Sequence, residues 1–350
     1  MKIPVVNDLH WGFKTGSPQF REYFVKFFET VFFPYIDKHG FKEIIFAGDF
    51  FDNRKFVNIE TVRAVREKFI EPLQKRGVTV HCILGNHDVY YKNTNVVNSL
   101  RELFSTYDHL KVYEAPTDVL VGDATIAMIS WLTADNQEQF REFLKTTTAK
   151  VAVGHFELAG FEMTRGVPCE DGMSRRVLDQ FDLVMSGHFH QKNGDGKVQY
   201  LGTQYDMTFS DLDETKGFHV FDTNTLSLEF VPNPLKMFYR LEYDDSNSGP
   251  FEMPDFSRYT DTYVKLVVKT KKNPRRYEKY ISALYDAVPL EVSIVEEYEL
   301  IDNNPEIDID ISADTLSIIY HDIDESKDIA NPGKLKQIMS ELYIESFEVE

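Results

Sequence analysis

The stretches EIIFAGDFFD (residues 43–52) and VTVHCILGNHD (residues 78–88) share one layout. Each opens with β-branched or aromatic residues and ends in a glycine that is followed by acidic, amide or imidazole side chains. This layout is typical of a buried strand that runs into a tight turn. Residues 60–75 between them are predicted to form a helix, with Gly77 behind it. A strand, a helix and a second strand in this order indicate a layered α/β domain.

The same alternation extends along the first 240 residues. Strands are predicted over residues 2–6, 43–47, 78–84, 111–113, 125–130, 151–153, 183–186, 198–201, 218–221 and 226–230. Helices are predicted over residues 19–39, 60–75, 94–104, 136–145 and 174–181, the first of them closed by Gly40. After residue 181 no predicted helix separates the strands, so the sheet is expected to become partly antiparallel or double.

The polar segment DDSNSGPFEMPD (residues 244–255) predicts a domain boundary. Beyond it, a small β-α-β unit is predicted, with strands over residues 263–269 and 291–295 and a helix over residues 274–287. We therefore expect a catalytic domain over residues 1–243, a capping domain over residues 256–298, a linker over residues 299–312 and a helical tail over residues 313–350.

The tail is predicted to hold two weakly amphipathic segments, residues 313–320 and 334–347. In the second, apolar side chains recur close to the i, i+3, i+4, i+7 spacing of one helix face, at Leu335, Ile338, Met339, Leu342 and Ile344. Such a stripe packs on its own domain or docks into a groove of a partner. The position of this segment beyond a polar linker favours docking on a partner over packing on its own domain.

The 350-residue chain has a formal net charge of −19, and residues 299–350 hold 14 acidic residues against 3 lysines. This charge argues against a free-standing nucleic-acid binder, because such proteins normally present a basic face to the phosphates. The two cysteines, Cys82 and Cys169, form no C-x-x-C motif, which excludes a disulfide framework and a thiolate zinc site. No 18-residue apolar run and no signal-peptide pattern occurs, so a cytoplasmic protein is expected.

Five short motifs place Asp, Asn or His directly after an apolar strand. They are Asp8-Leu9-His10, Gly48-Asp49-Phe50-Phe51-Asp52, Gly85-Asn86-His87-Asp88, Gly154-His155 and Gly187-His188-Phe189-His190. In open α/β sheets ligands gather at the carboxyl ends of the strands, so these strand ends are expected to deliver their side chains to one crevice. Each motif alone is a weak signal, whereas the ordered set holds five of the ten histidines of the chain.

Carboxylate and amide oxygens combined with imidazole nitrogens fit a pair of divalent cations about 3.5–4 Å apart, the arrangement that hydrolyses phosphate esters. One carboxylate then has to bridge the two ions, and Asp49 is expected to do so. The remaining ligands are expected to be Asp8, His10 and His190 for one ion and Asn86, His155 and His188 for the other. Imidazole binds metal in its neutral form, so the metal affinity is expected to fall below about pH 6.5.

The motifs D-x-H, GDxxD, GNHD, GH and GHxH, in this order, resemble those of the calcineurin-like metallophosphoesterase superfamily. More narrowly, the chain resembles the SbcD-type DNA repair and recombination nucleases, which include bacteriophage recombination endonuclease subunits. GNHD in place of the GNHE of phosphoprotein phosphatases, and Asn53 where those enzymes have an Arg-Gly step, favour the nuclease branch. The resemblance covers most of the chain and implies a four-layer αββα sandwich, a small β-α-β capping domain and a C-terminal helical tail.

This resemblance implies a Mn²⁺-dependent DNA nuclease with two metal ions, Mg²⁺ being the alternative. It implies that His87 stabilises the transition state or protonates the leaving 3'-oxygen, and that Asp52 orients His87. The expected activities are 3'-to-5' exonuclease on duplex DNA and endonuclease on single strands. The expected partners are DNA, a second copy of the chain and an SMC-type ABC ATPase bound by the C-terminal helices. For a phage-encoded protein the expected compartment is the host cytoplasm.

Two other function classes stay open. A phosphatase or phosphodiesterase acting on substrates other than DNA uses the same kind of ligand set. A non-catalytic scaffold can keep the fold and bind an ATPase, although the intact ligand set speaks against it. Outside the motifs, His81 and His219 are expected to be packed structural histidines, and Trp11 is expected to pack over the metal site.

Overall fold

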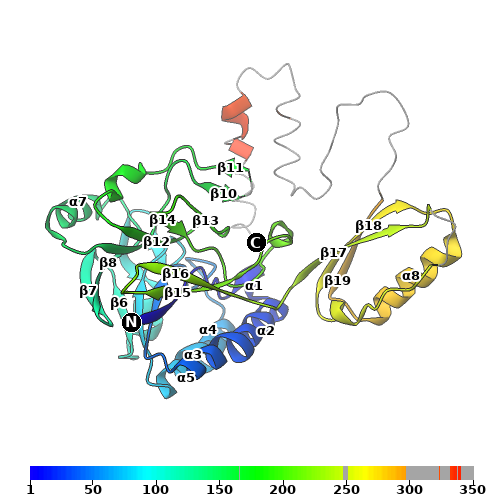
Figure 1. The fold of residues 1–350 in the computed structure, drawn as a ribbon, viewed down its shortest axis with the longest axis horizontal. Coiled ribbons are helices and arrows are strands. Elements are labelled where there is room, and N and C mark those ends of the chain that lie inside the picture. The colour runs from blue at the N-terminus through cyan, green and yellow to red at the C-terminus, as the bar shows by residue number, and fades with distance from the viewer. Residues whose placement is uncertain (165, 247–250, 297–322, 324–331, 337, 340–350) are drawn as a thin grey trace. The chain divides into compact units, whose positions relative to one another are not determined.

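The computed structural model describes residues 1–164, 166–246, 251–296, 323, 332–336 and 338–339 (Figure 1). The chain divides into two compact units. The first unit comprises Met1–Tyr205 and Glu214–Leu235, and the second comprises Asp206–Asp213 and the described residues from Lys236 onward.

The first sheet of the first unit has the strand order β16-β15-β1-β2-β3-β6. Its strands are β1 (Lys2–Val6), β2 (Glu43–Ala47), β3 (Thr79–Ile83), β6 (Leu110–Tyr113), β15 (Gly217–Asp222) and β16 (Ser227–Pro232). Strands β1, β2, β3 and β6 run parallel, whereas β15 and β16 are antiparallel to their neighbours. The carboxyl ends of three parallel strands that carry motifs therefore lie at one edge.

The second sheet has the order β13-β14-β12-β9-β8-β7. Its strands are β7 (Thr117–Val121), β8 (Ala124–Ile129), β9 (Val151–His155), β12 (Leu183–Gly187), β13 (Asn193–Gly194) and β14 (Val198–Tyr200). The four central strands are parallel, and the two edge strands are antiparallel. The expected mixed α/β fold with a double, partly antiparallel sheet is confirmed.

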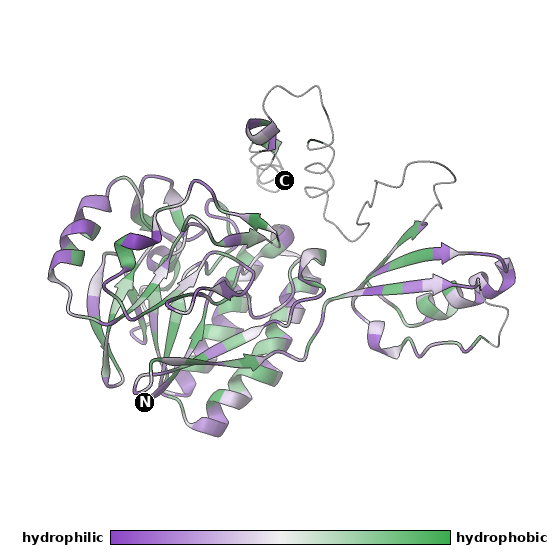
Figure 2. Cartoon of the chain, turned by 45° about the horizontal axis from the view of Figure 1, so that its top comes forward, coloured by the Kyte–Doolittle hydropathy of each residue, from purple (hydrophilic) through white to green (hydrophobic). Residues whose placement is uncertain are grey.

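The two sheets pack face to face through aliphatic side chains. Val5 and Ile45 of the first sheet and Met128, Val153 and Met185 of the second belong to one buried cluster. The other face of the second sheet packs against α7 (Gln137–Thr146), through Phe140. In Figure 2, α7 is mostly hydrophilic in colour, whereas the strands of the first unit contain many hydrophobic residues. Burial on both faces explains why the central strands read as nearly continuous apolar runs.

Two long predicted helices each contain one wider, π-helical turn. The first runs as α2 (Pro18–Phe27), a π turn (Phe28–Phe32) and α3 (Phe33–His39), and the second as α4 (Ile59–Val65), a π turn (Arg66–Ile70) and α5 (Glu71–Lys75). In each case a proline, Pro34 or Pro72, follows the π turn by two residues. Proline has no N–H to donate and its ring crowds the preceding turn, so the helix widens there without ending.

Two local predictions were wrong, and several strands, among them β7, were not predicted. Residues 94–104 form a strand, β5 (Thr94–Asn98), and a short helix, α6 (Ser99–Phe104); β5 pairs with β4 (Val89–Tyr91). The side chain of Asn98 caps α6 by accepting a hydrogen bond from the Arg101 amide at 2.9 Å, and the β-branched residues before it favour a strand. Residues 174–181 contain only a 3₁₀ turn (Arg175–Leu178).

In the second unit three parallel strands carry one helix. They are β17 (Phe238–Asp244), β18 (Tyr263–Thr270) and β19 (Glu291–Glu296), in this order, and α8 (Pro274–Asp286). Tyr243 of β17 packs with Tyr280 of α8 in the apolar core of this unit. Strand β17, which the sequence analysis assigned to the catalytic domain, therefore pairs with the β-α-β unit.

The predicted linker, residues 299–312, and the predicted segment 313–320 lie outside the described residues. Of the predicted segment 334–347, only residues 334–336 and 338–339 are described, and these are helical. Within the described part of the chain, no helix has the length and apolarity that a membrane crossing requires.

Strand β15 contains a buried histidine whose charge state makes the stability depend on pH. Burial, followed by the charge of Lys192, lowers the pKa of His219 to about 4. The neutral ring contributes fully to stability above the unfolded-state pKa of about 6.5, and this contribution is lost as the pH falls toward 4. When the pH is lowered from about 7.5 to 5, the free energy of unfolding is expected to fall in both proteins. In His219→Phe this fall is expected to be about 2 kcal/mol smaller than in the wild type. Urea unfolding at both pH values measures this difference, and equal losses in the two proteins contradict it.

Candidate metal centre

The five motifs converge at the carboxyl ends of parallel strands in both sheets. Asp8, Asp49 and Asn86 follow β1, β2 and β3 of the first sheet, while His155 ends β9 and His188 follows β12 of the second. The amide of His188 donates hydrogen bonds to both carboxylate oxygens of Asp8 at 3.1 Å, which links motifs from different sheets. The strand-end rule therefore brings together residues that lie up to 180 positions apart.

Several of these residues adopt a backbone conformation that is unfavourable for side chains other than glycine. Asp8, His10, Asp49 and His188 have φ angles of 46°, 44°, 59° and 90°. The first two loops are held together by main-chain hydrogen bonds, including Leu9 N–H to the Asp49 carbonyl at 2.8 Å. Each such residue costs about 1–3 kcal/mol and persists where its surroundings enforce it, typically at functional sites. Here the strained backbone turns side chains from two adjacent loops toward one point.

The first cluster consists of Asp8, His10 and His190. The Nε2 atoms of His10 and His190 lie 3.0 Å apart, and His10 Nε2 lies 3.8 Å from Asp8 Oδ1. Two neutral imidazole nitrogens that face each other repel through their lone pairs unless a proton or a cation lies between them. The facing nitrogens and the adjacent carboxylate therefore fit a cation.

The second cluster consists of Asp49, His155 and His188, with Asn86 between the rings. Asn86 Oδ1 lies 3.1 Å from both His155 Nε2 and His188 Nδ1. His155 Nδ1 donates to the Ala47 carbonyl at 2.9 Å, which leaves Nε2 as the nitrogen that faces the cluster. This hydrogen bond orients the ring for a ligand that accepts an imidazole lone pair.

Asp49 lies between the two clusters. Its Oδ2 atom is 3.2 Å from His155 Nε2 and 3.8 Å from His10 Nε2. Its other oxygen, Oδ1, accepts a hydrogen bond from the His87 amide at 2.8 Å. A single buried carboxylate therefore reaches the nitrogen donors of both clusters, as a bridging ligand must.

The charges at this site are complementary to those of divalent cations. Burial opposes ionisation of Asp49, but the neighbouring charges of His155 and His87 hold its pKa well below the usual range. Burial likewise lowers the pKa of His155, but the carboxylates of Asp49 and Asp8 raise it to about 9. Burial and the charge of His155 lower the pKa of His188 to about 3. The buried His and Asp side chains therefore form a centre that is consistent with two metal ions and attracts positive charge.

Asp88 supports the turns from below the cluster. Its buried carboxylate accepts hydrogen bonds from the amides of Asp49, Phe50 and Gly85 at 2.8–2.9 Å. Burial and the charge of Asp49 raise the pKa of Asp88 to about 7. Asp88 therefore holds the backbone of the turns that carry the proposed ligands, as residues next to metal ligands commonly do.

We expect the variant Asp88→Asn to be less stable by about 2 kcal/mol. Its NH₂ group cannot accept a hydrogen bond, so at least one buried backbone amide loses the acceptor that it has in the wild type. Urea unfolding of the metal-free protein measures the loss. The matched control is Asp118→Asn, since Asp118 is exposed and accepts from the Thr147 hydroxyl at 2.6 Å; a change within about 0.5 kcal/mol is expected there. Equal losses in the two variants contradict the supporting role of Asp88.

His87 and Asp52 meet in a way that the sequence did not predict. The Nδ1 atom of His87 contacts the main-chain carbonyl of Asp52. The Asp52 carboxylate lies instead against His10, with Oδ1 3.2 Å from Nδ1. His87 itself is partly exposed, and its ring stands edge-on to that of His10 with centroids 5.0 Å apart. The two residues are therefore in contact through the main chain of Asp52 and not through its carboxylate.

Two residues that the sequence analysis missed border the second cluster. Trp131, which follows β8, has its ring centroid 5.3 Å from that of His188 and 6.0 Å from that of His155. Glu157 Oε2 lies 3.9 Å from His188 Nε2. Trp131 also follows a strand end, and this was the available signal. Trp11, which was expected to pack over the metal site, is buried and stacks on Phe28 with ring centroids 5.7 Å apart.

A double-sheet α/β unit whose strand ends carry His and Asp clusters consistent with a dinuclear metal site is typical of a metallophosphoesterase. A family model described as calcineurin-like phosphoesterase matches residues 1–192, and the chain belongs to this family.

The chain is 31% identical to exonuclease subunit 1 of Enterobacteria phage T4 over 350 residues, covering 99% of both chains. It is 23% identical over 312 residues to the SbcD component of the SbcCD nuclease of Staphylococcus epidermidis, covering 76% of this chain and 82% of that one. Among solved structures, a novel archaeal phosphodiesterase is 13% identical with a TM-score of 0.33, covering 67% of this chain and all of that one.

Proposed function

We propose that this chain is the nuclease subunit of a DNA-processing complex. The observation that carries the proposal is the position of Asp49 between two buried clusters, with His87 partly exposed beside them. The full-length similarity to exonuclease subunit 1 of phage T4, together with the similarity to the SbcD component of the SbcCD nuclease, supports DNA as the substrate. The proposed activities are 3'-to-5' exonuclease on duplex DNA and endonuclease on single strands.

The proposed ligands are the side chains that the sequence singled out. Asp8, His10, His190 and Asp49 would hold one ion, and Asn86, His155, His188 and Asp49 would hold the other. Mn²⁺ is the proposed metal, and a bound pair supplies the positive charge that activates water and stabilises the attacking and leaving oxygens. His87, with Nδ1 against the Asp52 carbonyl, is proposed to donate a proton from Nε2 to the leaving 3'-oxygen.

Incubation of purified protein and Mn²⁺ with linear duplex DNA, single-stranded DNA and an aryl phosphodiester tests the proposal. Cleavage of both DNA substrates supports a nuclease. Hydrolysis of the small ester alone points to a phosphodiesterase acting on other substrates, and no hydrolysis of any substrate points to a scaffold. End-labelled duplexes report the direction of digestion.

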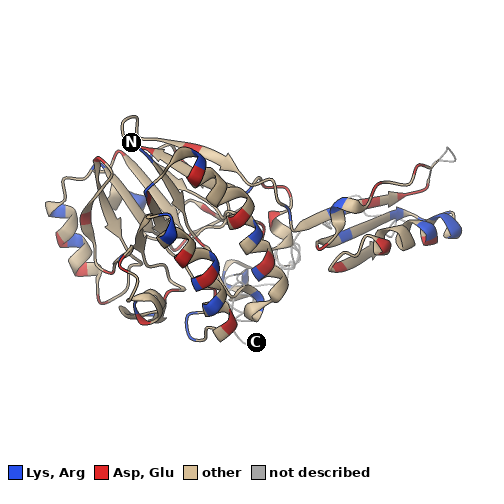
Figure 3. Ribbon diagram, turned by 90° about the horizontal axis from the view of Figure 1, so that it is seen from below, with Lys and Arg blue, Asp and Glu red and all other residues tan. Residues whose placement is uncertain are grey.

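The domains are proposed to divide the work. The first unit is proposed as the αββα nuclease domain, the β17–β19 unit as the capping domain, and residues 313–350 as a tail that binds an SMC-type ABC ATPase. Figure 3 shows acidic and basic side chains interspersed along the helices that cover the first sheet, where Arg63 pairs with Glu60 and Lys68 with Glu29. Since these basic side chains are neutralised, an ATPase partner is proposed to supply DNA-binding surface. Co-purification of an ATPase with the full chain, but not with one ending at Asn303, tests this role.

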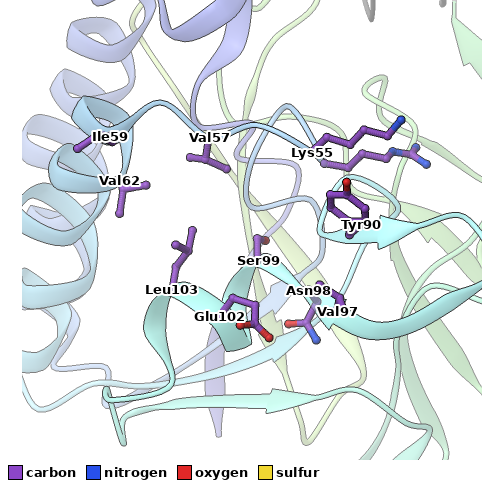
Figure 4. A pocket seen from close by; sticks show the side chains of 11 residues that line it. Lys55, Val57, Ile59, Val62, Tyr90, Val97, Asn98, Ser99, Glu102 and Leu103 are labelled. Atoms are coloured by element: carbon purple, nitrogen blue, oxygen red, sulfur yellow. The ribbon is translucent and has the colours of Figure 1, made fainter.

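The chain is also proposed to form a homodimer through an apolar hollow in the first unit. This hollow has a volume of about 400 Å³, and Val57, Val62 and Leu103 line it (Figure 4). Lys55 lies at one side and Glu102 at another, so two copies related by a two-fold axis can pair opposite charges. Apolar side chains at or beside the hollow are strongly exposed, including Ile59 at 87% and Phe56 at 78%. A surface patch of this kind typically marks an interface.

We expect the variant Ile59→Asp to be a monomer in light scattering at a concentration at which the wild type is a dimer. Burying an unpaired carboxylate in an apolar interface costs several kcal/mol, enough to shift dissociation by orders of magnitude. The matched control is Leu120→Asp, because Leu120 is also exposed, at 67%, but lies on β7. A wild-type monomer, or two variants that behave alike, argues against this interface.

A further inference from the structure

The side chain of Asp52 contacts a residue of the first cluster. Its Oδ1 atom lies 3.2 Å from Nδ1 of His10, a ring that is 2% exposed, whereas the carboxylate is 26% exposed. The opposite nitrogen of the same ring, Nε2, lies 3.0 Å from His190 Nε2 and 3.8 Å from carboxylate oxygens of Asp8 and Asp49. One nitrogen of His10 thus faces the metal centre and the other faces Asp52.

This arrangement divides the two nitrogens of His10 by function. The separation of His10 Nδ1 and Asp52 Oδ1 is that of an ion pair, although its angle is not that of a hydrogen bond. With the proton on Nδ1, on the side of the carboxylate, the ring keeps its lone pair on Nε2, which faces the centre. Histidines that bind metal commonly give their second N–H to a carboxylate, which fixes the tautomer and the ring orientation and makes the ligand more basic.

The contact with His87 uses a different part of Asp52. His87 Nδ1 meets the Asp52 carbonyl, which every substitution at position 52 retains. Two backbone contacts hold this segment: Asp52 N–H donates to the Trp11 carbonyl at 3.0 Å, and Phe51 forms a parallel bridge with Trp11. A change of the Asp52 side chain therefore removes the partner of His10 while the backbone still orients His87.

We propose that the carboxylate of Asp52 is a positioning residue for the metal ligand His10 and not the partner that orients His87. The inference rests on the proposed metal centre and refines it. Asp52 sets the Mn²⁺ affinity of the His10 cluster, while His87 is oriented by a main-chain carbonyl. The carboxylate thus acts on metal occupancy, and the general acid is independent of it.

Calorimetric titration of the full-length chain with Mn²⁺ alone tests the proposal. In Asp52→Ala we expect one of two binding steps to weaken by about 10–100-fold. Turnover at low Mn²⁺ falls accordingly, and excess Mn²⁺ restores most of it. In a Trp11→Phe background, where Trp131 is the sole tryptophan, fluorescence reports the other cluster, because Trp131 lies beside His188 and His155. Its response to Mn²⁺ is expected at the same Mn²⁺ concentration with and without Asp52→Ala. Asp52→Asn keeps an acceptor without the charge, so its affinity is expected to lie between those of wild type and Asp52→Ala.

The matched control is Asn53→Ala. Asn53 supports the same loop by accepting from the amides of Lys55 and Phe56 at 2.9 and 3.1 Å. Wild-type Mn²⁺ affinity is expected in this variant, and a loss as large as that of Asp52→Ala overturns the proposal, because loop disorder then explains both. Unchanged Mn²⁺ affinity in Asp52→Ala, with turnover reduced at saturating Mn²⁺, also overturns it. If Asp52→Ala does not fold, the same two outcomes are read from Asp52→Asn. Failure of the wild type to cleave DNA refutes the proposed substrate but leaves the Mn²⁺ titrations to decide the role of Asp52.

Discussion

The variant Asp49→Asn is expected to weaken binding at both metal steps and to cleave DNA at least about 1,000-fold more slowly than wild type. The substitution keeps the shape of the side chain and an acceptor for the His87 amide, but it removes the charge that faces both His10 and His155. Metal ions contribute several kcal/mol to stabilising a phosphoryl-transfer transition state, and each 1.36 kcal/mol is a factor of ten in rate.

Calorimetric titration with Mn²⁺ and single-turnover cleavage of a labelled duplex measure these effects, and circular dichroism checks the fold. Asp8→Asn provides the internal comparison, because Asp8 belongs to the first cluster and a single binding step should weaken most. Asp108→Asn, at an exposed turn residue, should behave as wild type. Loss of only one binding step in Asp49→Asn would falsify the bridging role of this carboxylate.

The variant Gly85→Ala is expected to lose stability and metal binding together. A Cβ atom at this position would lie 2.0 Å from Asp49 Oδ1 and 2.5 Å from the Asp49 backbone nitrogen. The backbone contact cannot be relieved by a change of rotamer, so the turn that holds Asp49 must move. Overpacking of this kind costs about 3 kcal/mol, and a displacement of about 1 Å is enough to disrupt a metal site.

Urea unfolding of the metal-free protein and Mn²⁺ titration measure the two effects. The control is Gly77→Ala, because a Cβ atom at Gly77 meets nothing within 4 Å and only its φ of 62° is unfavourable. This control is expected to lose about 1 kcal/mol and to keep wild-type Mn²⁺ affinity. A Gly85→Ala protein that binds Mn²⁺ as wild type does contradicts the close packing at this turn.

Local pattern was enough to predict most elements of the first unit. The strands over residues 2–6 and 43–47 were predicted to the residue, because both are short apolar runs that end in turns. The pattern gave a wrong prediction at residues 94–98. The apolar residues there continue the helical spacing of the segment that follows, but β-branched residues and the pairing with β4 make the segment a strand. The pattern also did not predict the π-helical turns before Pro34 and Pro72. The spacing of apolar residues does not show where a proline leaves one main-chain carbonyl without its helical hydrogen bond.

The set of polar residues at the centre was predictable, but some of their contacts were not. Strand ends bring Asp8, Asp49 and His155 to one place whatever the details of the loops, so the motifs were sufficient. The contact of Asp52 with His10 depends instead on left-handed backbone angles in the first loop, which no motif encodes. Trp131 has no ligand chemistry of its own and is recognisable only from its distance to His188.

The hydrogen bonds between the His188 amide and Asp8 close a span of 180 residues. A ribosome must therefore release more than half of the polypeptide before its first motif meets its last one. Until then a nascent chain carries only part of the proposed set of metal ligands. The same long closure slows folding, because the entropy of a large loop has to be lost before these contacts reward it.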